Sequence, residues 1–282
     1  MIIVKLQGGL GNQMFQYAAG RSLAAKYNVP LYLDQSFLER NNHNRNGFTA
    51  RKFELNIFNI AANKLSISLI DDIFDANADA TFKIYNEKPV SYDRSFKEAK
   101  PFVYMNGYWQ SHLYFNHISH VLKQDFSFKE STFFKKNQKT IDQLVNCNSV
   151  AVHIRRGDYI GHPLISLCPL SYYEQAMDRL LVSEQDAIFF VFCDDLKWAV
   201  ENLHFDKAPV WFKGKEQNPD WLDMYFMSIC KHNIIANSTF SWWSAWLNKN
   251  PNQQVVAPSK WFHQERKGIN LDDLCLPTWI LI

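Results

Sequence analysis

One stretch of the sequence combines side chains that bind anions with side chains that move protons: Ser149 to Tyr159, Ser-Val-Ala-Val-His-Ile-Arg-Arg-Gly-Asp-Tyr. Its apolar first half is typical of a buried strand, which we predict for residues 150–154. At or beyond the carboxyl end of that strand, where open α/β sheets bind ligands, lie His153, Arg155, Arg156 and Asp158. Adjacent guanidinium groups match phosphate oxygens, so the stretch indicates a doubly negative ligand. A surface cluster of ion pairs is the alternative interpretation.

Two further polar clusters follow predicted strands in the same way. Asp194 and Asp195 suit hydrogen bonds to a ribose hydroxyl or to a base edge that carries N–H groups, as guanine does, and a metal ion is the alternative ligand. Because the sequence contains no Asp-x-Asp, the spacing common in metal-dependent sugar transferases, we expect no metal. The second cluster opens a predicted helix, whose free amide groups offer a phosphate seat or are simply capped: Asn237, Ser238, Thr239, Phe240 and Ser241.

A glycine-rich turn stands near the start of the chain, between a predicted strand at residues 2–6 and a predicted helix at 14–27. This order is close to the dinucleotide-binding fingerprint, although the third glycine is missing. The turn also carries two amides at the helix N-terminus, which can bind hydroxyls or phosphate oxygens. We favour a loop for a polar ligand of another kind over a nicotinamide or flavin site. The residues concerned are Gly9, Gly11, Asn12 and Gln13, with Asp34 as the acid of the dinucleotide alternative.

The second half of the chain alternates continuous apolar strands with helices, which predicts a doubly wound parallel sheet covered on both faces. We predict strands at 150–154, 187–193, 209–212, 233–236 and 254–257, and helices at 171–181, 196–203, 220–230 and 241–247. Ser171 and Glu174 are expected to form a capping box. The first half begins in the same style, but residues 37–51 read as a long polar surface loop. We infer two α/β halves with a cleft between them and a boundary near residues 135–148.

Composition excludes several classes of function. A net charge of +2 over 282 residues gives no reason to expect nucleic acid as a partner. The five cysteines contain no Cys-x-x-Cys pair, which favours buried thiols in a reducing compartment over disulfides or zinc. No run of 18 apolar residues and no signal peptide is evident, so we expect no transmembrane segment. The expected location is the cytoplasm, with peripheral association at the inner face of the membrane left open.

Four blocks together resemble the α-1,2-fucosyltransferases of glycosyltransferase family 11. They are Gly-Gly-Leu-Gly-Asn-Gln-Met-Phe-Gln-Tyr-Ala at 8–18, His-Ile-Arg-Arg-Gly-Asp-Tyr at 153–159, Phe-Cys-Asp-Asp at 192–195 and Asn-Ser-Thr-Phe-Ser-Trp-Trp-Ser-Ala-Trp-Leu at 237–247. They occur in the order of the family, and the first and last are long and specific. The resemblance implies an α/β GT-B fold, with an acceptor-binding domain at residues 1–140 and a Rossmann-like donor domain at 141–282. It also leaves open that the C-terminal tail packs back on the first domain.

The resemblance further implies an inverting transfer of L-fucose from GDP-fucose to the 2-hydroxyl of a galactose-containing glycan, without cofactor or metal. Arg155 would bind the β-phosphate with Arg156 nearby, and Asn12 would lie near the reacting centre. His153 and either Asp194 or Asp195 would hold the guanosine. The residues around the diphosphate would be Ser238, Thr239 and Ser241, in the donor-binding segment that also includes Asn237 and Phe240.

Some questions stay open at the level of sequence. Asp158 is a candidate general base, although we favour an ion pair that orients Arg155 or Arg156. Acceptor contacts are expected within residues 37–51 and 106–117, where Asn106-Gly-Tyr-Trp-Gln110 forms either a sugar platform or an aromatic turn of the core. A non-catalytic nucleotide-sugar-binding or glycan-binding protein and an NAD-type oxidoreductase remain as alternative functions. The oligomeric state is unknown.

Overall fold

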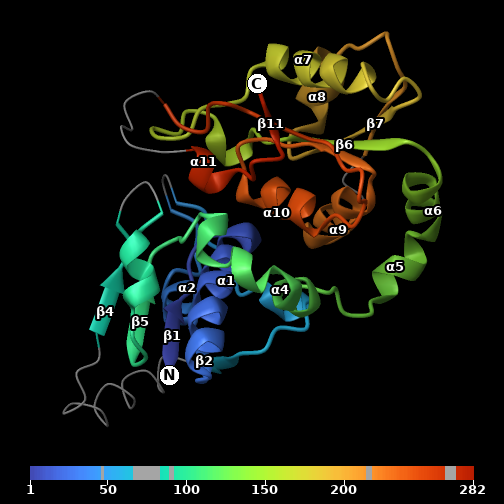
Figure 1. Cartoon of the computed structure of the whole chain (residues 1–282). Helices are drawn as coiled ribbons and strands as arrows, with labels where there is room; N and C mark the ends of the chain where they lie inside the picture. The colour runs from blue at the N-terminus through green and yellow to red at the C-terminus, as the bar shows by residue number, and fades with distance from the viewer. Residues whose placement is uncertain (46–47, 66–82, 89–91, 214–217, 264–270) are drawn as a thin grey trace. The chain divides into compact units, whose positions relative to one another are not determined.

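The computed structural model describes residues 1–45, 48–65, 83–88, 92–213, 218–263 and 271–282. The chain forms two compact units, each with its own parallel sheet (Figure 1). The first unit comprises Met1–Lys129 together with the described residues 271–276. The second comprises the described part of residues 130–267 together with Pro277–Ile282. The contacts therefore divide the chain earlier than residue 140, and a short C-terminal segment groups with the first unit.

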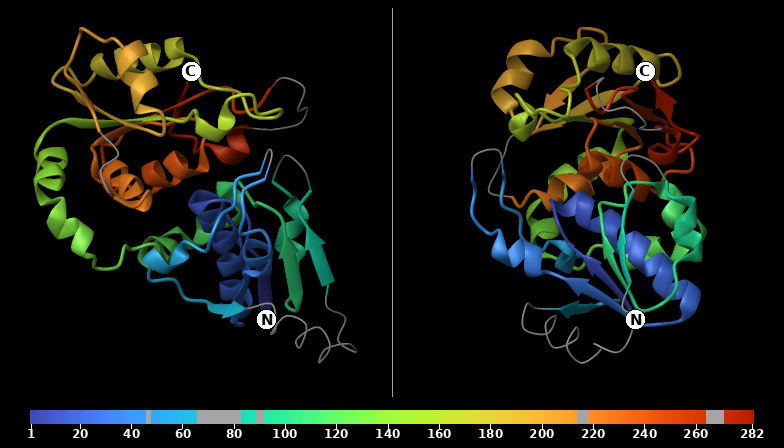
Figure 2. Two further views of the ribbon diagram at one scale, coloured as in Figure 1. Left: turned by 180° about the vertical axis from the view of Figure 1, so that it is seen from behind. Right: turned by 90° about the vertical axis from the view of Figure 1, so that its left-hand side faces the viewer.

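The first unit contains a sheet with the strand order β3-β2-β1-β5-β4, in which neighbouring strands are parallel. Helix α1 packs on β1 and β2 (Figure 2). The helix starts at Leu10, earlier than the predicted residue 14, so Asn12 and Gln13 lie in its first turn. The bounds are β1 Ile2–Lys5, α1 Leu10–Tyr27, β2 Leu31–Asp34, β3 Asn63–Leu65, β4 Lys83–Asn86 and β5 Val103–Asn106.

Short helices complete the first unit. One of them, α2 at Ser36–Arg40, corrects the prediction that residues 37–51 are only a loop. The carboxylate of Asp34 accepts a hydrogen bond from the N–H of Ser36 at 2.7 Å, and so fixes the first turn of this helix. Residues 46–47 of the predicted loop lie outside the described residues. The other helical segments are η1 Leu55–Ile57, η2 Arg94–Glu98, η3 His112–Tyr114, η4 Asn116–Ile118, α4 Ser119–Asp125 and α11 Leu271–Leu274.

The second unit contains the predicted doubly wound sheet, with the strand order β11-β10-β9-β6-β7-β8 and parallel pairing throughout. The strands are β6 Ser149–Ile154, β7 Ile188–Cys193, β8 Val210–Phe212, β9 His232–Ile234, β10 Val255–Ala257 and β11 Ile280–Leu281. The helices are α5 Thr132–Lys136, α6 Gln138–Asn146, α7 Leu170–Leu181, α8 Leu196–Asn202, α9 Trp221–Ile229 and α10 Thr239–Leu247. The sequence analysis identified these strands except the last.

Alternate residues of the central strand β6 face opposite sides of the sheet, as the pleat requires. Val150, Val152 and Ile154 pack in one buried cluster with side chains of α7 and α8. Ala151 belongs to a second cluster, formed with α6 and α9. Both faces of the sheet are therefore covered, which explains why its strands are apolar at nearly every position.

Two local predictions in this unit were wrong. Helix α7 begins at Leu170 after Pro169 and has no side-chain cap, so Ser171 lies inside the first turn and forms no capping box. The boundary between the two halves was predicted near residues 135–148, but the contacts divide the chain between Lys129 and Glu130, so α5 belongs to the second unit. The ring of Phe134 lies 4.5 Å from that of Tyr225 on α9, measured between centroids, so aromatic packing fixes this segment to the second unit.

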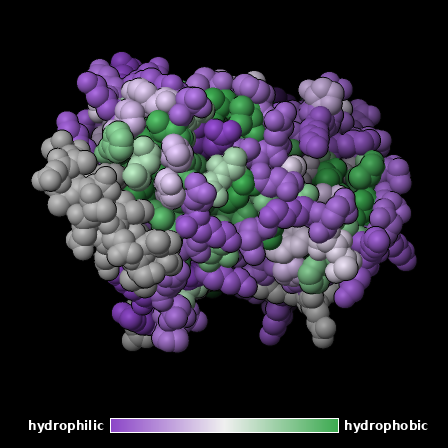
Figure 3. All heavy atoms as spheres, turned by 90° about the horizontal axis from the view of Figure 1, so that it is seen from below, coloured by the Kyte–Doolittle hydropathy of each residue, from purple (hydrophilic) through white to green (hydrophobic). Residues whose placement is uncertain are grey.

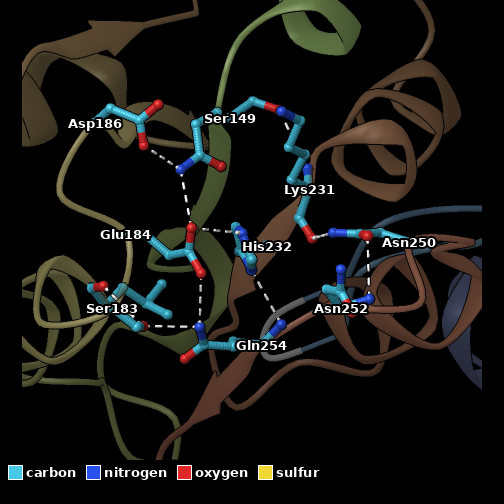
Figure 4. A network of polar contacts seen from close by, with 11 residues as sticks. Ser149, Ser183, Glu184, Asp186, Lys231, His232, Asn250, Asn252 and Gln254 are labelled. Atoms are coloured by element: carbon cyan, nitrogen blue, oxygen red, sulfur yellow. Dashed lines mark hydrogen bonds and ion pairs between the residues drawn. The ribbon is translucent and has the colours of Figure 1, made fainter.

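A network of polar side chains joins the amino ends of four strands of the second sheet (Figure 4). The amide of Asn148 donates to Glu184 at 3.0 Å and to Asp186 at 2.7 Å. The ring of His232 accepts the N–H of Gln254 at 3.1 Å and lies 3.6 Å from the Glu184 carboxylate. This network satisfies polar groups at the edge opposite to the predicted ligand site.

Among the described residues, no helix combines the length and the apolar composition that a membrane span requires. Figure 3 shows one face on which hydrophobic side chains lie in separate groups among hydrophilic ones. Such scattered apolar side chains are normal for a protein surface.

Candidate functional site

The strand order brings together three clusters that are far apart in the sequence. Strand β6 lies between β7 and β9, so the segments after these strands emerge side by side at one edge of the sheet. After β6 the chain proceeds to β7 and β8 on one side and then returns to β9 on the other. This reversal is a topological switch point, where doubly wound sheets bind ligands. The clusters concerned are residues 153–158, 194–195 and 237–241.

Arg155 lies between two carboxylates at this edge. Its Nη2 donates to Oδ1 of Asp158 at 2.6 Å, and its Nη1 lies 2.8 Å from Oδ2 of Asp194. Its guanidinium also lies over the ring of Tyr159, 5.5 Å from the centroid. Burial alone would lower the pKa of Arg155, but the two carboxylates raise it above its ordinary value. The Arg155 side chain is 24% exposed, so a fixed positive charge remains open to a ligand.

Arg156 has different partners from Arg155. Its Nε lies 3.3 Å from Oδ2 of Asp195, and its guanidinium lies 3.8 Å from the centroid of the Trp198 ring. Its backbone N–H donates to Oδ1 of Asp194 at 2.9 Å. The two guanidinium groups, which are adjacent in sequence, therefore bind separate sets of side chains. The sequence analysis did not include Trp198 in the site. Its position in the first turn of the helix that follows Asp195 could have indicated that it lies near this edge of the sheet.

The two aspartates at the end of β7 also differ. Asp195 is the N-cap of α8, and its Oδ1 accepts the N–H of Trp198 at 3.2 Å. Its side chain is 32% exposed, whereas that of Asp194 is 16% exposed. Each carboxylate oxygen of Asp194 contacts one of the two arginines.

His153 lies at the end of β6 and is only 6% exposed. Its ring faces that of Phe240, with centroids 5.8 Å apart. Burial, reinforced by the positive charge of Arg155, lowers the pKa of His153 to about 4, so the ring is neutral near pH 7. Within the described part of the chain, its buried Nδ1 has no hydrogen-bond partner. A buried imidazole nitrogen of this kind suits a hydrogen bond to a ligand.

Helix α10 begins at Thr239, two residues before the predicted start at Ser241, and its first turn is capped by a side chain. Ser238 is the N-cap, and its hydroxyl accepts the N–H of Phe240 at 3.4 Å. Asn237 is turned inward, because its amide donates to the carbonyls of Ser166 and Trp261 at 2.6 and 2.9 Å. The buried hydroxyl of Ser241 likewise donates to backbone carbonyls, while Thr239 is partly buried in the first turn. The side chains of Asn237 and Ser241 are therefore used in hydrogen bonds within the fold.

The glycine-rich turn of the first unit lies at the switch point of its own sheet, where β1 is flanked by β2 and β5. Gly9 is the N-cap of α1, and Gly11 lies buried in the first turn. The side chain of Asn12 accepts a hydrogen bond from Gln110, which follows β5, at 2.9 Å. Gln13 is fully buried, donates to the carbonyls of Gly8 and Lys52 and accepts the N–H of Glu54, so its amide holds the loop together.

Two alternatives for the first unit lose support. Asp34, the acid of a dinucleotide site, is buried and accepts hydrogen bonds from the N–H of Ser36 and the hydroxyl of Tyr104 at 2.7 and 2.5 Å. Its oxygens are thus used within the fold rather than presented to a ribose. Trp109 is fully buried against Tyr114, which favours an aromatic turn of the core over a sugar platform.

Comparison with known proteins places these features in a family. The whole chain, residues 1–282, matches the sequence model of glycosyl transferase family 11. The chain is 35% identical to the O-antigen biosynthesis glycosyltransferase WbnK of Escherichia coli, over 98% of each chain. It is 33% identical to an alpha-1,2-colitosyltransferase of Escherichia coli, over 100% of this chain and 99% of the relative. Human galactoside alpha-(1,2)-fucosyltransferase 1 is 26% identical over 64% of this chain and 56% of its own.

A solved structure supports the architecture. The crystal structure of POFUT1 in complex with GDP superposes with a TM-score of 0.53 at 11% identity, over 91% of this chain and 97% of that chain. At this identity the likeness concerns the fold alone. It confirms the predicted α/β fold class, GT-B, which agrees with the two parallel sheets described above.

Proposed function

We propose, from the premise that this chain belongs to glycosyltransferase family 11, that the enzyme transfers L-fucose from GDP-β-L-fucose to the 2-hydroxyl of a β-galactoside. The relatives named as α-(1,2)-fucosyltransferases of galactosides support fucosyl transfer to a galactoside. The acceptor would be part of an oligosaccharide or a surface polysaccharide. One relative is named as an α-1,2-colitosyltransferase and is 33% identical, which makes colitosyl transfer the second candidate.

The observation that carries the proposal is the position of Arg155 at the switch point of the second sheet. Its guanidinium is partly exposed and held by two carboxylates, next to the strand that leads into α10. A cation fixed in advance stabilises the charge that develops on the β-phosphate as GDP leaves. In this proposal the acceptor hydroxyl attacks from the opposite face of the sugar, so the anomeric configuration inverts. No metal is required, because Arg155 and the N-terminus of α10 bind the diphosphate.

The remaining side chains are assigned by their surroundings. The neutral ring of His153 would bind the nucleoside with one of the aspartates, and Ser238 and Thr239 would lie beside the diphosphate. Asp158 contacts Arg155 at 2.6 Å, which supports an orienting ion pair rather than a free general base. Asn12, paired with Gln110, would serve the acceptor side.

The proposal includes a cytoplasmic location. All five cysteines are free thiols, and burial raises the pKa of each of them. Unreactive, unpaired thiols agree with a reducing compartment.

The test is release of GDP from GDP-fucose in the presence of EDTA, with and without lactose or another β-galactoside. Release that is stimulated by the acceptor and resists the chelator would support a metal-independent fucosyltransferase. Lys207→Ala serves as the control variant, because Lys207 forms an exposed ion pair with Asp178 on the surface of the second unit. If calorimetry detects binding of neither GDP-fucose nor GDP, the proposal is wrong. Binding without release would redirect the search to other acceptors or to a colitosyl donor.

A further inference from the structure

The carboxylate of Asp194 touches both arginines of the motif. Its Oδ1 accepts the backbone N–H of Arg156 at 2.9 Å, which fixes the chain just beyond β6. Its Oδ2 lies 2.8 Å from Nη1 of Arg155. This second contact is an ion pair rather than a directed hydrogen bond, because among the described residues Oδ2 has no hydrogen-bond partner of acceptable geometry, and it is closed to solvent. Asp194 therefore holds both the backbone and the charged end of the phosphate-binding segment.

Gly157 provides the space that this arrangement needs. A Cβ atom at position 157 would lie 2.8 Å from Oδ2 of Asp194, closer than real Cβ contacts allow. The backbone of Gly157 does not adopt the left-handed conformation, so the requirement for glycine is one of space. The turn Gly157–Tyr159 then brings Asp158 to the other side of Arg155.

The oxygens of Asp195 also have partners, the N–H of Trp198 and Nε of Arg156, but this carboxylate is more accessible to a base than that of Asp194. Its side chain has twice the exposed fraction of that of Asp194, 32% against 16%. Guanine is recognised through its N–H groups, which need a carboxylate oxygen that the ligand can reach. Both oxygens of Asp194 are directed at the arginines, and Oδ2 has no exposed surface.

We infer that Asp194 is a positioning residue that holds Arg155 in the orientation required for the leaving phosphate, and that guanine recognition falls to Asp195. This inference rests on the proposed function, because it assigns a role at the same donor site. Without the Asp194 carboxylate, the acidic partner that Arg155 keeps among the described residues is Asp158, whose side chain is 33% exposed and lies in a short turn, together with the Tyr159 ring. The guanidinium then samples other rotamers. Misplacement of a catalytic group by about 1 Å can cost about a hundredfold in rate.

The test compares Asp194→Asn with Asp195→Asn. For each variant, kcat and KM for GDP-fucose are measured, together with the inhibition constants of GDP and IDP, which differ by the 2-amino group of guanine. We expect Asp194→Asn to lower kcat by about 10- to 100-fold and to leave the preference for GDP over IDP unchanged. Asp195→Asn should weaken that preference. If Asp194→Asn abolishes the preference for GDP and keeps kcat, the inference is wrong.

Gly157→Ala provides a second variant that keeps every charge. Its Cβ would displace Oδ2 of Asp194, the atom that contacts Arg155, so we expect a fall in kcat, again with unchanged GDP preference. An unchanged kcat in a folded Gly157→Ala variant would contradict the inference.

Calorimetry separates this inference from the proposed function. If the wild-type protein binds GDP but transfers no fucose, the comparison of GDP and IDP binding still shows which aspartate reads the base.

Discussion

Replacing Arg155 by alanine should affect the rate and the stability by amounts that can be separated. One preorganised donor to a developing oxyanion contributes about 10²- to 10³-fold in rate, or about 2.7–4 kcal/mol. Breaking a fully buried ion pair costs about 3–5 kcal/mol. The Arg155 and Asp194 side chains are 24% and 16% exposed, so solvent screening reduces this to about 1–3 kcal/mol. We therefore expect Arg155→Ala to lose at least about a hundredfold in kcat and to remain folded.

The matched control is Arg21→Ala in the first unit. Arg21 pairs with Asp125 at 3.0 Å, and their side chains are 23% and 10% exposed, close to the values for Arg155 and Asp194. This variant should lose a similar free energy of unfolding without loss of kcat. Arg155→Lys should fail to restore the rate, because an ammonium cannot reproduce the planar fork of the guanidinium. The assay is acceptor-dependent GDP release, with urea unfolding of each variant. An Arg155→Ala or Arg155→Lys enzyme with near-normal kcat would refute the assignment.

Three further predictions concern stability. Burial lowers the pKa of His153 to about 4, so the unfolded chain binds the proton more strongly than the folded protein. The protein should therefore lose stability as the pH falls from about 6.5 to about 4. Urea unfolding of His153→Asn should show a weaker pH dependence than that of the wild type. Gly20→Ala should cost about 1–3 kcal/mol in the same assay, since its Cβ would lie 2.3 Å from Cγ2 of Val4 between α1 and the sheet. Burial opposes ionisation of Asp93, but hydrogen bonds lower its pKa to about 2, so Asp93→Asn should cost about 2 kcal/mol near pH 7. This difference should vanish in thermal melts as the pH falls from about 3.8 to about 2.

The fold was largely predictable because the sequence patterns that indicate its strands and helices are local. Strands buried on both faces are apolar throughout, and their alternation with helices has one common solution, the parallel doubly wound sheet. Predictions failed where a non-local or competing contact decides. Pro169 sets the start of α7 and overrides the capping signal of Ser171. The ring contact of Phe134 with Tyr225 fixes α5 to the second unit, although the boundary was predicted near residues 135–148.

The location of the candidate site was predictable, but the partners of its side chains were not. Parallel strands place their carboxyl ends at one edge, so the sequence indicates which clusters meet there. It does not indicate that Asn237 and Gln13 point inward, because an amide bonds a backbone carbonyl as readily as a ligand. Nor does the sequence show that Asp194 forms an ion pair with Arg155, since this contact joins the ends of two different strands.

The balance of charge at the donor edge indicates how an anion can bind there. Two guanidinium groups, of Arg155 and Arg156, face three carboxylates, of Asp158, Asp194 and Asp195, so these side chains carry a net charge of about −1 near neutral pH. Long-range attraction by net charge therefore cannot account for binding of a diphosphate. Helix α10 follows the adjacent strand β9, and its first turn contains no acidic residue. The positive end of the helix dipole is therefore not neutralised by a carboxylate of that turn. Under the proposed function, a diphosphate at this edge would then bind through short-range hydrogen bonds, donated by Arg155 on one side and by the α10 backbone on the other, and its binding should depend more on their geometry than on ionic strength.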